Sequence, residues 1–262
     1  MKTVLRQELR LGAAACAIWS GSIAVLLAVC IFLFPEMKSG MDGVSELFAS
    51  MGSFTAAFGM DRLNFGTLTG FYAIECGNIL GLGGAFFAAL TAVGILSKEE
   101  RGHTADFLLT HPLTRLQAAA GKLCAVLVQI LLLNAVALAV SLGSIVAVGE
   151  TIPWRELLLL HLAHLLLQIE VAAICFCISA FLRRGGAGAG LGLAILFYML
   201  NLLANISDQA AFLRHLTPFA YVEGAAIVAD GRLDLSLVLP GMAAAVLAAA
   251  VAFVQYRRQD IL

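Results

Sequence analysis

Six apolar runs, each long enough to cross a lipid bilayer, constrain this chain more than any other feature of its sequence. One membrane-spanning helix needs about 20 apolar residues. In lipid, a single segment satisfies its own backbone polar groups only as a helix. The sequence therefore predicts an all-α polytopic membrane protein, a single domain over residues 1–262 with six transmembrane helices. The predicted spans are 13–34, 74–96, 117–148, 157–182, 187–205 and 236–256.

The composition excludes an ordinary soluble domain. Apolar residues make up 61% of the chain and charged residues 13%, against roughly 45–50% and about 25% in an average soluble domain. The interior of a soluble fold cannot hide so much apolar surface, so we expect the lipid bilayer to cover much of it. The six cysteines all fall within or beside predicted spans, where thiols act as small apolar groups, and they predict neither a disulfide nor a metal site.

The distribution of Lys and Arg predicts the orientation of the chain, because cytosolic connections carry an excess of these residues. With a cytosolic N-terminus, eleven lie inside and five outside. The eleven are Lys2, Arg6, Arg10, Lys98, Arg101, Arg115, Lys122, Arg183, Arg184, Arg257 and Arg258, and the five are Lys38, Arg62, Arg155, Arg214 and Arg232. We therefore expect both termini in the cytosol, with 97–115 as a cytosolic and 35–73 as an outer connection.

The polar connection 97–115, SKEERGHTADFLLTHPLTR, carries helix-boundary signals at both ends. Two pairs have the spacing of a capping box, Ser97 with Glu100 and Thr114 with Gln117. Pro112 ends the intervening helix because it lacks an amide hydrogen and clashes with the preceding turn. The apolar residues Phe107 and Leu108 then either lie on the membrane surface or enter a groove of a partner protein.

This region resembles the permease subunits of ABC-2 type ATP-binding-cassette exporters. TADFLLTHPLTR (Thr104 to Arg115), followed by Gly121 and Lys122, is similar to the segment after their second span. The stretch LTPFAYVEGAAIVADGRLDL (Leu216 to Leu235) is similar to the part of the family before the last span. In the family, a Gly is commonly followed directly by a Thr where the first of these segments begins, whereas here His103 stands between Gly102 and Thr104. The resemblance covers the whole chain and does not indicate the substrate.

The resemblance implies a permease subunit that exports a substrate across the bacterial inner (plasma) membrane but is not itself an enzyme. Segment 97–115 would be its coupling helix, seated in a cleft of a separate ATPase, and residues near the N-terminus would form an elbow helix. Implied partners are two ABC ATPase subunits, which bind ATP and Mg, and a second permease subunit, identical or paralogous; no nucleic acid is implied. The implied coupling residues are Glu99, Glu100, Thr104, Asp106, Phe107, Leu108, Pro112 and Arg115.

The sequence agrees that this chain does not hydrolyse ATP. A P-loop has the pattern G-x-x-x-x-G-K-[ST], in which the hydroxyl residue follows the lysine. The chain has one Gly-Lys pair, Gly121–Lys122, and Leu123 follows it. We therefore expect no cofactor or metal on this chain, and ATP hydrolysis on a partner.

Small residues recur every four positions in two predicted spans, a spacing that permits close helix approach in lipid. They are Ala13, Ala17 and Gly21 in the first span, and Gly186 with Gly190 and Gly188 with Gly192 in the fifth. The pattern fits packing within one subunit or contact between two subunits. The resemblance favours a subunit contact, since the first and fifth spans of the family lie there.

The fourth predicted span carries polar residues that are costly in a membrane. His161, His164 and Gln168 share one helical face, and Glu170 lies about 180° from His161. One interpretation is structural, with Glu170 either protonated or paired with a polar neighbour such as Gln129 or Asn134; the other gives it a role in transport. We expect both histidines near the outer surface of the membrane, as a hydrated surface pair.

Two alternative functions each require features that can be sought in the sequence. A proton- or ion-coupled carrier would use Glu170, yet no internal repeat marks a midplane site. An intramembrane hydrolase would need G-x-S-x-G or H-E-x-x-H, and neither occurs in the sequence. The outer connection 35–73 interleaves Gly with Leu and Phe, which predicts short amphipathic or re-entrant helices that either cap an exit or act as a lid.

Overall fold

The computed structural model describes residues 1–39, 52, 55, 57, 63, 64, 66–96, 114–182 and 186–258. All regular structure in these ranges is helical, and six helices are long and apolar enough to cross a membrane. The predicted fold class and number of spans are therefore confirmed. The spans are α1 (Lys2–Ser39), the composite α4 (Leu68–Cys76), η1 (Gly77–Leu82) and α5 (Gly83–Ala92), α8 (Arg115–Val148), α9 (Trp154–Ser179), α10 (Ala187–Ile206) and α12 (Leu235–Arg258).

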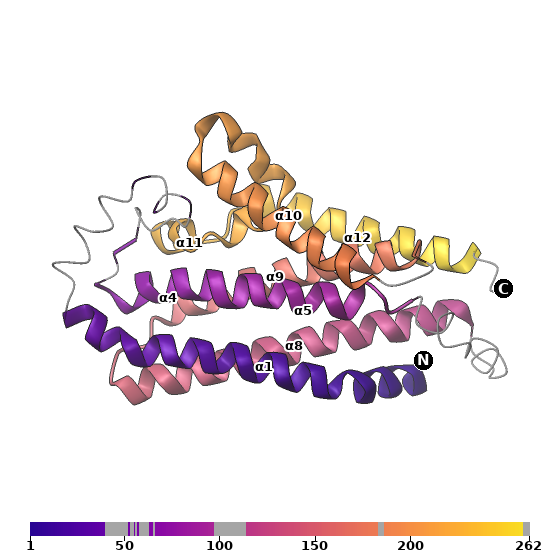
Figure 1. Ribbon diagram of the computed structural model, residues 1–262, viewed down its shortest axis with the longest axis horizontal. Helices are drawn as coiled ribbons and strands as arrows, with labels where there is room; N and C mark the ends of the chain where they lie inside the picture. Colours follow the sequence, from indigo (N-terminus) through magenta and orange to yellow (C-terminus); the bar gives the residue numbers. More distant parts are fainter. Residues whose placement is uncertain are drawn as a thin grey trace.

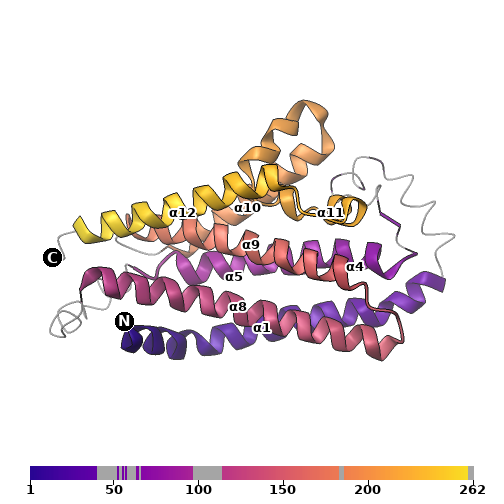
Figure 2. The same cartoon turned by 180° about the vertical axis from the view of Figure 1, so that it is seen from behind.

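The helices form an elongated bundle with α9 as its most buried span (Figure 1). α1 packs along α8, while α9 contacts α5, α8 and α12. Figure 2 shows α12, α9 and α8 side by side on the opposite face. The first turn of α1, the start of α8 and the last turn of α12 lie at the same end of the bundle, as an even number of crossings requires (Figure 1).

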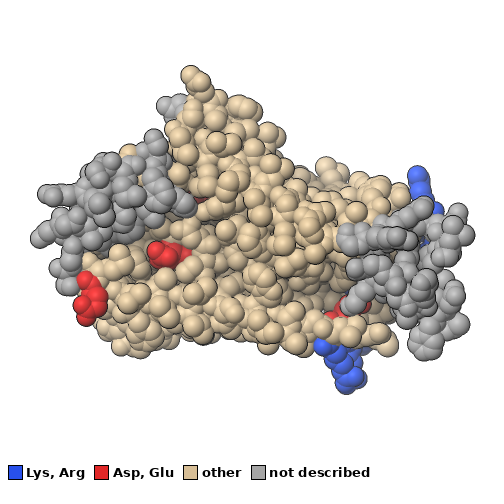
Figure 3. Space-filling view, viewed as in Figure 1, with Lys and Arg blue, Asp and Glu red and all other residues tan. Residues whose placement is uncertain are grey.

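The surface has the charge distribution of a membrane-embedded bundle. On the face shown in Figure 3, charged atoms lie mainly toward the two ends, apart from acidic atoms over α4. Large apolar side chains are exposed along the spans, among them Ile18, Leu131 and Val246. Lipid or another subunit must cover these side chains, because exposure of so much apolar surface to water is unfavourable.

The N-terminal residues continue directly into the first span. α1 runs from Lys2 to Ser39 as one helix. Val4 is buried and approaches Gly121 of α8, whereas Arg6 and Arg10 are exposed. The structure therefore does not confirm a separate elbow helix, since this turn already packs on α8 along the axis of the span.

A re-entrant stretch connects the fifth and sixth spans, a feature that the sequence did not predict here. After α10, the chain forms the 3₁₀ helices η2 (Asp208–Leu216) and η3 (Ala220–Val222) and the short helix α11 (Gly224–Asp230). The Thr217 hydroxyl donates to the carbonyl of Phe197, near the middle of α10, at 2.7 Å. The chain therefore returns to the middle of the fifth span before it reaches α12. Most of 35–73, where re-entrant helices were expected, lies outside the described residues.

The fifth-span glycines pack within the chain. A Cβ atom at Gly186 would lie 2.7 Å from the Val93 carbonyl oxygen, and one at Gly190 would lie 3.0 Å from a Val93 methyl group. The small size of both residues is thus explained by the close approach of α10 to the second span, which corrects their assignment to a subunit contact. In contrast, Gly188 and Gly192 face open space, and so does Gly21 of α1.

Candidate functional site

Only the last two residues of the predicted coupling segment 97–115, Thr114 and Arg115, are described. Seven of its implied coupling residues lie outside the described residues: Glu99, Glu100, Thr104, Asp106, Phe107, Leu108 and Pro112. Arg115 is described and is the first residue of α8. The geometry on either side of the segment therefore has to define the site.

The third span begins with the capping box that the sequence predicts. The Thr114 hydroxyl accepts from the backbone N–H of Gln117 at 3.2 Å, and the Gln117 side-chain oxygen accepts from the backbone N–H of Thr114 at 3.2 Å. Both hydrogen bonds satisfy amides that otherwise lack a partner at a helix start. This cap fixes the point at which segment 97–115 joins α8.

Two buried side chains hold the end of the second span, just before the segment begins. The Nζ atom of Lys122, which is fully buried, donates to the carbonyl oxygen of Ile95 at 2.6 Å. The hydroxyl of Ser179, at the end of α9, accepts from the backbone N–H of Leu96 at 2.9 Å. The entry to segment 97–115 is thus tied both to α8 and to α9.

The histidines of α9 belong to a buried hydrogen-bonded group and are not hydrated. His161 is 5% exposed and His164 is fully buried. The Tyr72 hydroxyl lies 2.8 Å from His161 Nε2 and donates to the Ser141 hydroxyl at 2.8 Å. The expectation of a hydrated surface pair is wrong, because α4 and α8 pack over this face of α9 and supply polar partners.

A second part of this group surrounds the π-helical turn η1 of the second span. His164 Nδ1 lies 2.6 Å from the Leu160 carbonyl oxygen. Gln168 accepts from the Asn134 amide at 2.6 Å and donates to the carbonyl of Leu80, a residue of η1, at 3.4 Å. A π-helical turn interrupts the regular helical hydrogen bonds and often marks a functional site. The polar groups of α9 therefore reach the irregular turn of the second span.

Gly84 provides the space for Gln168, so we expect Gly84→Ala to destabilise the fold by about 1–3 kcal/mol. A Cβ atom there would clash with the Gln168 amide, which is fully buried and hydrogen-bonded on both sides. Thermal unfolding of the purified protein in nanodiscs measures the effect.

Gly83→Ala is the matched control for this substitution. A Cβ atom at Gly83 would lie 3.4 Å from Ile23, an ordinary contact. We expect this variant to be as stable as the parent or more stable, since Ala favours the helix. Adding Gln168→Ala should reduce the cost of Gly84→Ala. Equal unfolding temperatures for the two single glycine variants would contradict the clash.

Glu170 lies on the other face of α9, as its helical spacing predicts, but its partner differs from both candidates. Its Oε2 atom accepts from the Tyr221 hydroxyl at 2.9 Å. Asn134 instead donates to Gln168, and Gln129 lies against Gly12 of α1. The predicted pairing of Glu170 with Gln129 or Asn134 is therefore wrong, because the re-entrant stretch delivers Tyr221 to this face.

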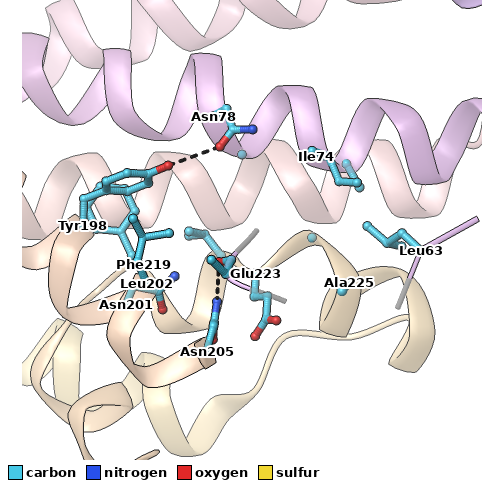
Figure 4. Close-up of a pocket in the computed structure, with 15 residues that line it drawn as sticks. Leu63, Ile74, Asn78, Tyr198, Asn201, Leu202, Asn205, Phe219, Glu223 and Ala225 are labelled. Atoms are coloured by element: carbon cyan, nitrogen blue, oxygen red, sulfur yellow. Dashed lines mark hydrogen bonds between the residues drawn. The ribbon is translucent and has the colours of Figure 1, made fainter. Parts of the chain in front are cut away.

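A small polar pocket of about 50 Å³ lies between the second span, α10 and α11 (Figure 4). The Tyr198 hydroxyl donates to the Asn78 side-chain oxygen across it at 3.4 Å. Asn201 also lines the pocket, and its side-chain oxygen is buried without a hydrogen-bond partner among the described residues. The volume is sufficient for a few water molecules.

Tyr72, Ser141 and Tyr221 were not predicted from the sequence as members of the hydrogen-bonded groups on the two faces of α9. The available signal was the presence of hydroxyl groups within or beside apolar runs, where each buried polar atom needs a partner. No group of three or more His, Cys, Asp or Glu in the described ranges is arranged to hold a metal ion. The described polar groups therefore offer hydrogen bonds and individual carboxylates, among them Glu170 and Glu223.

Comparison with known proteins identifies the family. The family model for "ABC-2 family transporter protein" matches residues 23–261, nearly the whole chain. No curated protein matches the chain. The matched range includes all six spans from the second half of α1 onward, and it agrees with the six helices of the structure. The chain belongs to the ABC-2 family of transporter proteins.

Proposed function

We propose that this chain is the permease subunit of an ATP-driven exporter and that segment 97–115 docks on a separate ATPase subunit. Family membership supports a permease component. The sequence contains no P-loop, so the proposal assigns ATP and Mg to the partner. Both termini and segment 97–115 would lie in the cytosol, in the inner membrane of a bacterium.

The observation that carries the proposal is the anchoring of both ends of the segment. A coupling element has to pass a displacement from an aqueous partner to the spans. Lys122 and Ser179 tie its entry to α8 and α9, and the Thr114 capping box fixes its exit on α8. A movement of the segment would therefore reach the third and fourth spans directly, through hydrogen bonds between buried groups.

The proposal includes a second permease subunit. In the described structure, Ala13, Ala17 and Gly21 are exposed on α1. Gly188 and Gly192 face open space on α10, which is among the least buried spans. Close helix approach at these small residues supports a subunit contact. The complete exporter would contain two permease and two ATPase subunits.

Purification together with a candidate ABC ATPase from the same organism tests the function. We expect a complex with two copies of each subunit, and an ATPase rate in nanodiscs well above that of the isolated ATPase. The mass of the complex and the rate of phosphate release are the measurements. An ATPase that neither binds the chain nor changes its rate in the presence of the chain would refute the proposal.

A further inference from the structure

A cavity of about 260 Å³ lies between α9, α12 and the re-entrant stretch that follows α10. Its lining contains an acidic residue, Glu170, and two basic residues, Arg214 and His215. Apolar side chains form much of the remaining wall: Ile174, Phe197, Leu216, Leu237 and Ala244. Among the described residues no ion pair joins the carboxylate of Glu170 to Arg214 across the cavity, so a ligand that meets both groups would be stabilised there.

The acidic side of the cavity has free capacity to accept hydrogen bonds. The Glu170 side chain is 6% exposed, and the Tyr221 hydroxyl is its one hydrogen-bond donor in the described structure. A carboxylate accepts about four hydrogen bonds. Gly241 of α12 makes room for the carboxylate itself, because a Cβ atom there would clash with Glu170 Oε2. The carboxylate is therefore able to receive a compact group with several N–H donors.

The basic side of the cavity has an unused donor. The Nε atom of Arg214 is buried and has no hydrogen-bond partner among the described residues. Another nitrogen of the same guanidinium donates to the Asn205 side-chain oxygen at 3.4 Å, which holds the group beside α10. A buried N–H without an acceptor costs free energy. An anionic oxygen in the cavity would remove that cost.

The charges and the volume together restrict the ligand. A simple cation at Glu170 would share the cavity with Arg214, and a simple anion at Arg214 would share it with Glu170. A zwitterion satisfies both sides. Pockets for drug-sized ligands have volumes of roughly 300–1,000 Å³, so this smaller cavity holds a polar head group while any larger apolar part of the ligand stays outside it. The neighbouring Leu216 is 59% exposed and offers an apolar surface to that part of the ligand.

We propose that this cavity binds an ammonium–phosphate zwitterion, the chemistry of an aminophospholipid head group, with the ammonium on Glu170 and the phosphate on Arg214. A primary ammonium supplies three N–H donors to the carboxylate. Phosphate oxygens accept strongly from a guanidinium. The site requires no ATPase, so it stands whether or not the proposed coupling is correct.

Lipid binding to the purified chain, measured by native mass spectrometry in detergent, tests the site. The probes are phosphatidylethanolamine, phosphatidylglycerol and phosphatidylcholine with identical acyl chains. We expect the ethanolamine lipid to bind about tenfold more tightly than the other two. Glu170→Gln, Arg214→Gln and Gly241→Ala should each remove this preference. Glu75→Gln, which changes another carboxylate in a span, is the matched control and should keep it.

The outcomes distinguish a soluble ligand from a membrane lipid, and they include results that would overturn the proposal. Displacement of the lipid by soluble phosphoethanolamine would identify the free zwitterion as a ligand, and retention of the lipid would identify the membrane as its source. Melting curves show whether each variant is folded. Equal binding of the three lipids to the parent chain would overturn the proposal, as would an unchanged preference in folded Glu170→Gln and Arg214→Gln.

Discussion

Replacing Phe107 and Leu108 together by alanine is expected to abolish the stimulation of the partner ATPase. These side chains are the apolar anchors of segment 97–115 in our proposal. Truncation of a buried anchor at a protein interface commonly costs 2 kcal/mol or more, and every 1.4 kcal/mol is a factor of ten in affinity. Loss of two anchors therefore separates the subunits at the concentrations used in an assay. The ATPase rate is measured as a function of permease concentration.

Leu116→Ala serves as the control for this double variant. Leu116 is 52% exposed on the first turn of α8, next to the segment but outside the proposed anchors. We expect its stimulation to equal that of the parent chain. If the double variant stimulates the ATPase as well as the parent does, segment 97–115 is not the docking element.

Lys122→Met is expected to lower the stimulation about tenfold while the complex still forms. Methionine fills a similar volume but cannot donate to the Ile95 carbonyl, so the entry of the segment loses its tie to α8. A hydrogen bond with a charged donor contributes about 1.5–3 kcal/mol, which corresponds to a factor of ten or more. The measurements are the ATPase rate at saturating permease and the elution volume of the complex.

Lys38→Met is the same substitution at an exposed site. Lys38 forms a surface ion pair with Glu150 at 3.0 Å, and such pairs contribute about 0–1 kcal/mol. The Lys38→Met chain should stimulate the ATPase as strongly as the parent chain does. Ser179→Ala should act in the same direction as Lys122→Met but less strongly, because it removes a neutral hydrogen bond to Leu96. Full stimulation by Lys122→Met would show that this tie does not transmit movement.

The local features of the chain were predictable because they depend on residues close in sequence. The apolar runs gave six helices, and the third begins at the Thr114–Gln117 capping box. The spacing along α9 separated Glu170 from His164 and Gln168. Each of these conclusions uses only the length, the periodicity or the end chemistry of one helix.

The partners of the polar groups were not predictable, since they come from segments far apart in the chain. Tyr221 reaches Glu170 across 51 positions, and Tyr72 reaches His161 across 89. The small-residue pattern gave the same signal for Gly186, which packs on Val93, and for Gly188, where an added Cβ atom would meet no atom of the described residues. A spacing of four identifies a helical face but not the helix that covers it.

The sequence by itself determined that this protein crosses the membrane six times and that its third span starts with a capping box. It also determined that the chain carries no P-loop motif for ATP hydrolysis. Lipid forces each long apolar run to close its own backbone hydrogen bonds, so these outcomes need no knowledge of neighbouring helices. The tertiary structure alone decided that Lys122 and Ser179 hold the entry of segment 97–115 and that Glu170 and Arg214 line one cavity. Those contacts depend on how the helices pack against one another, and helix packing in lipid is set by surface shape and by polar groups that find partners only after the spans have assembled.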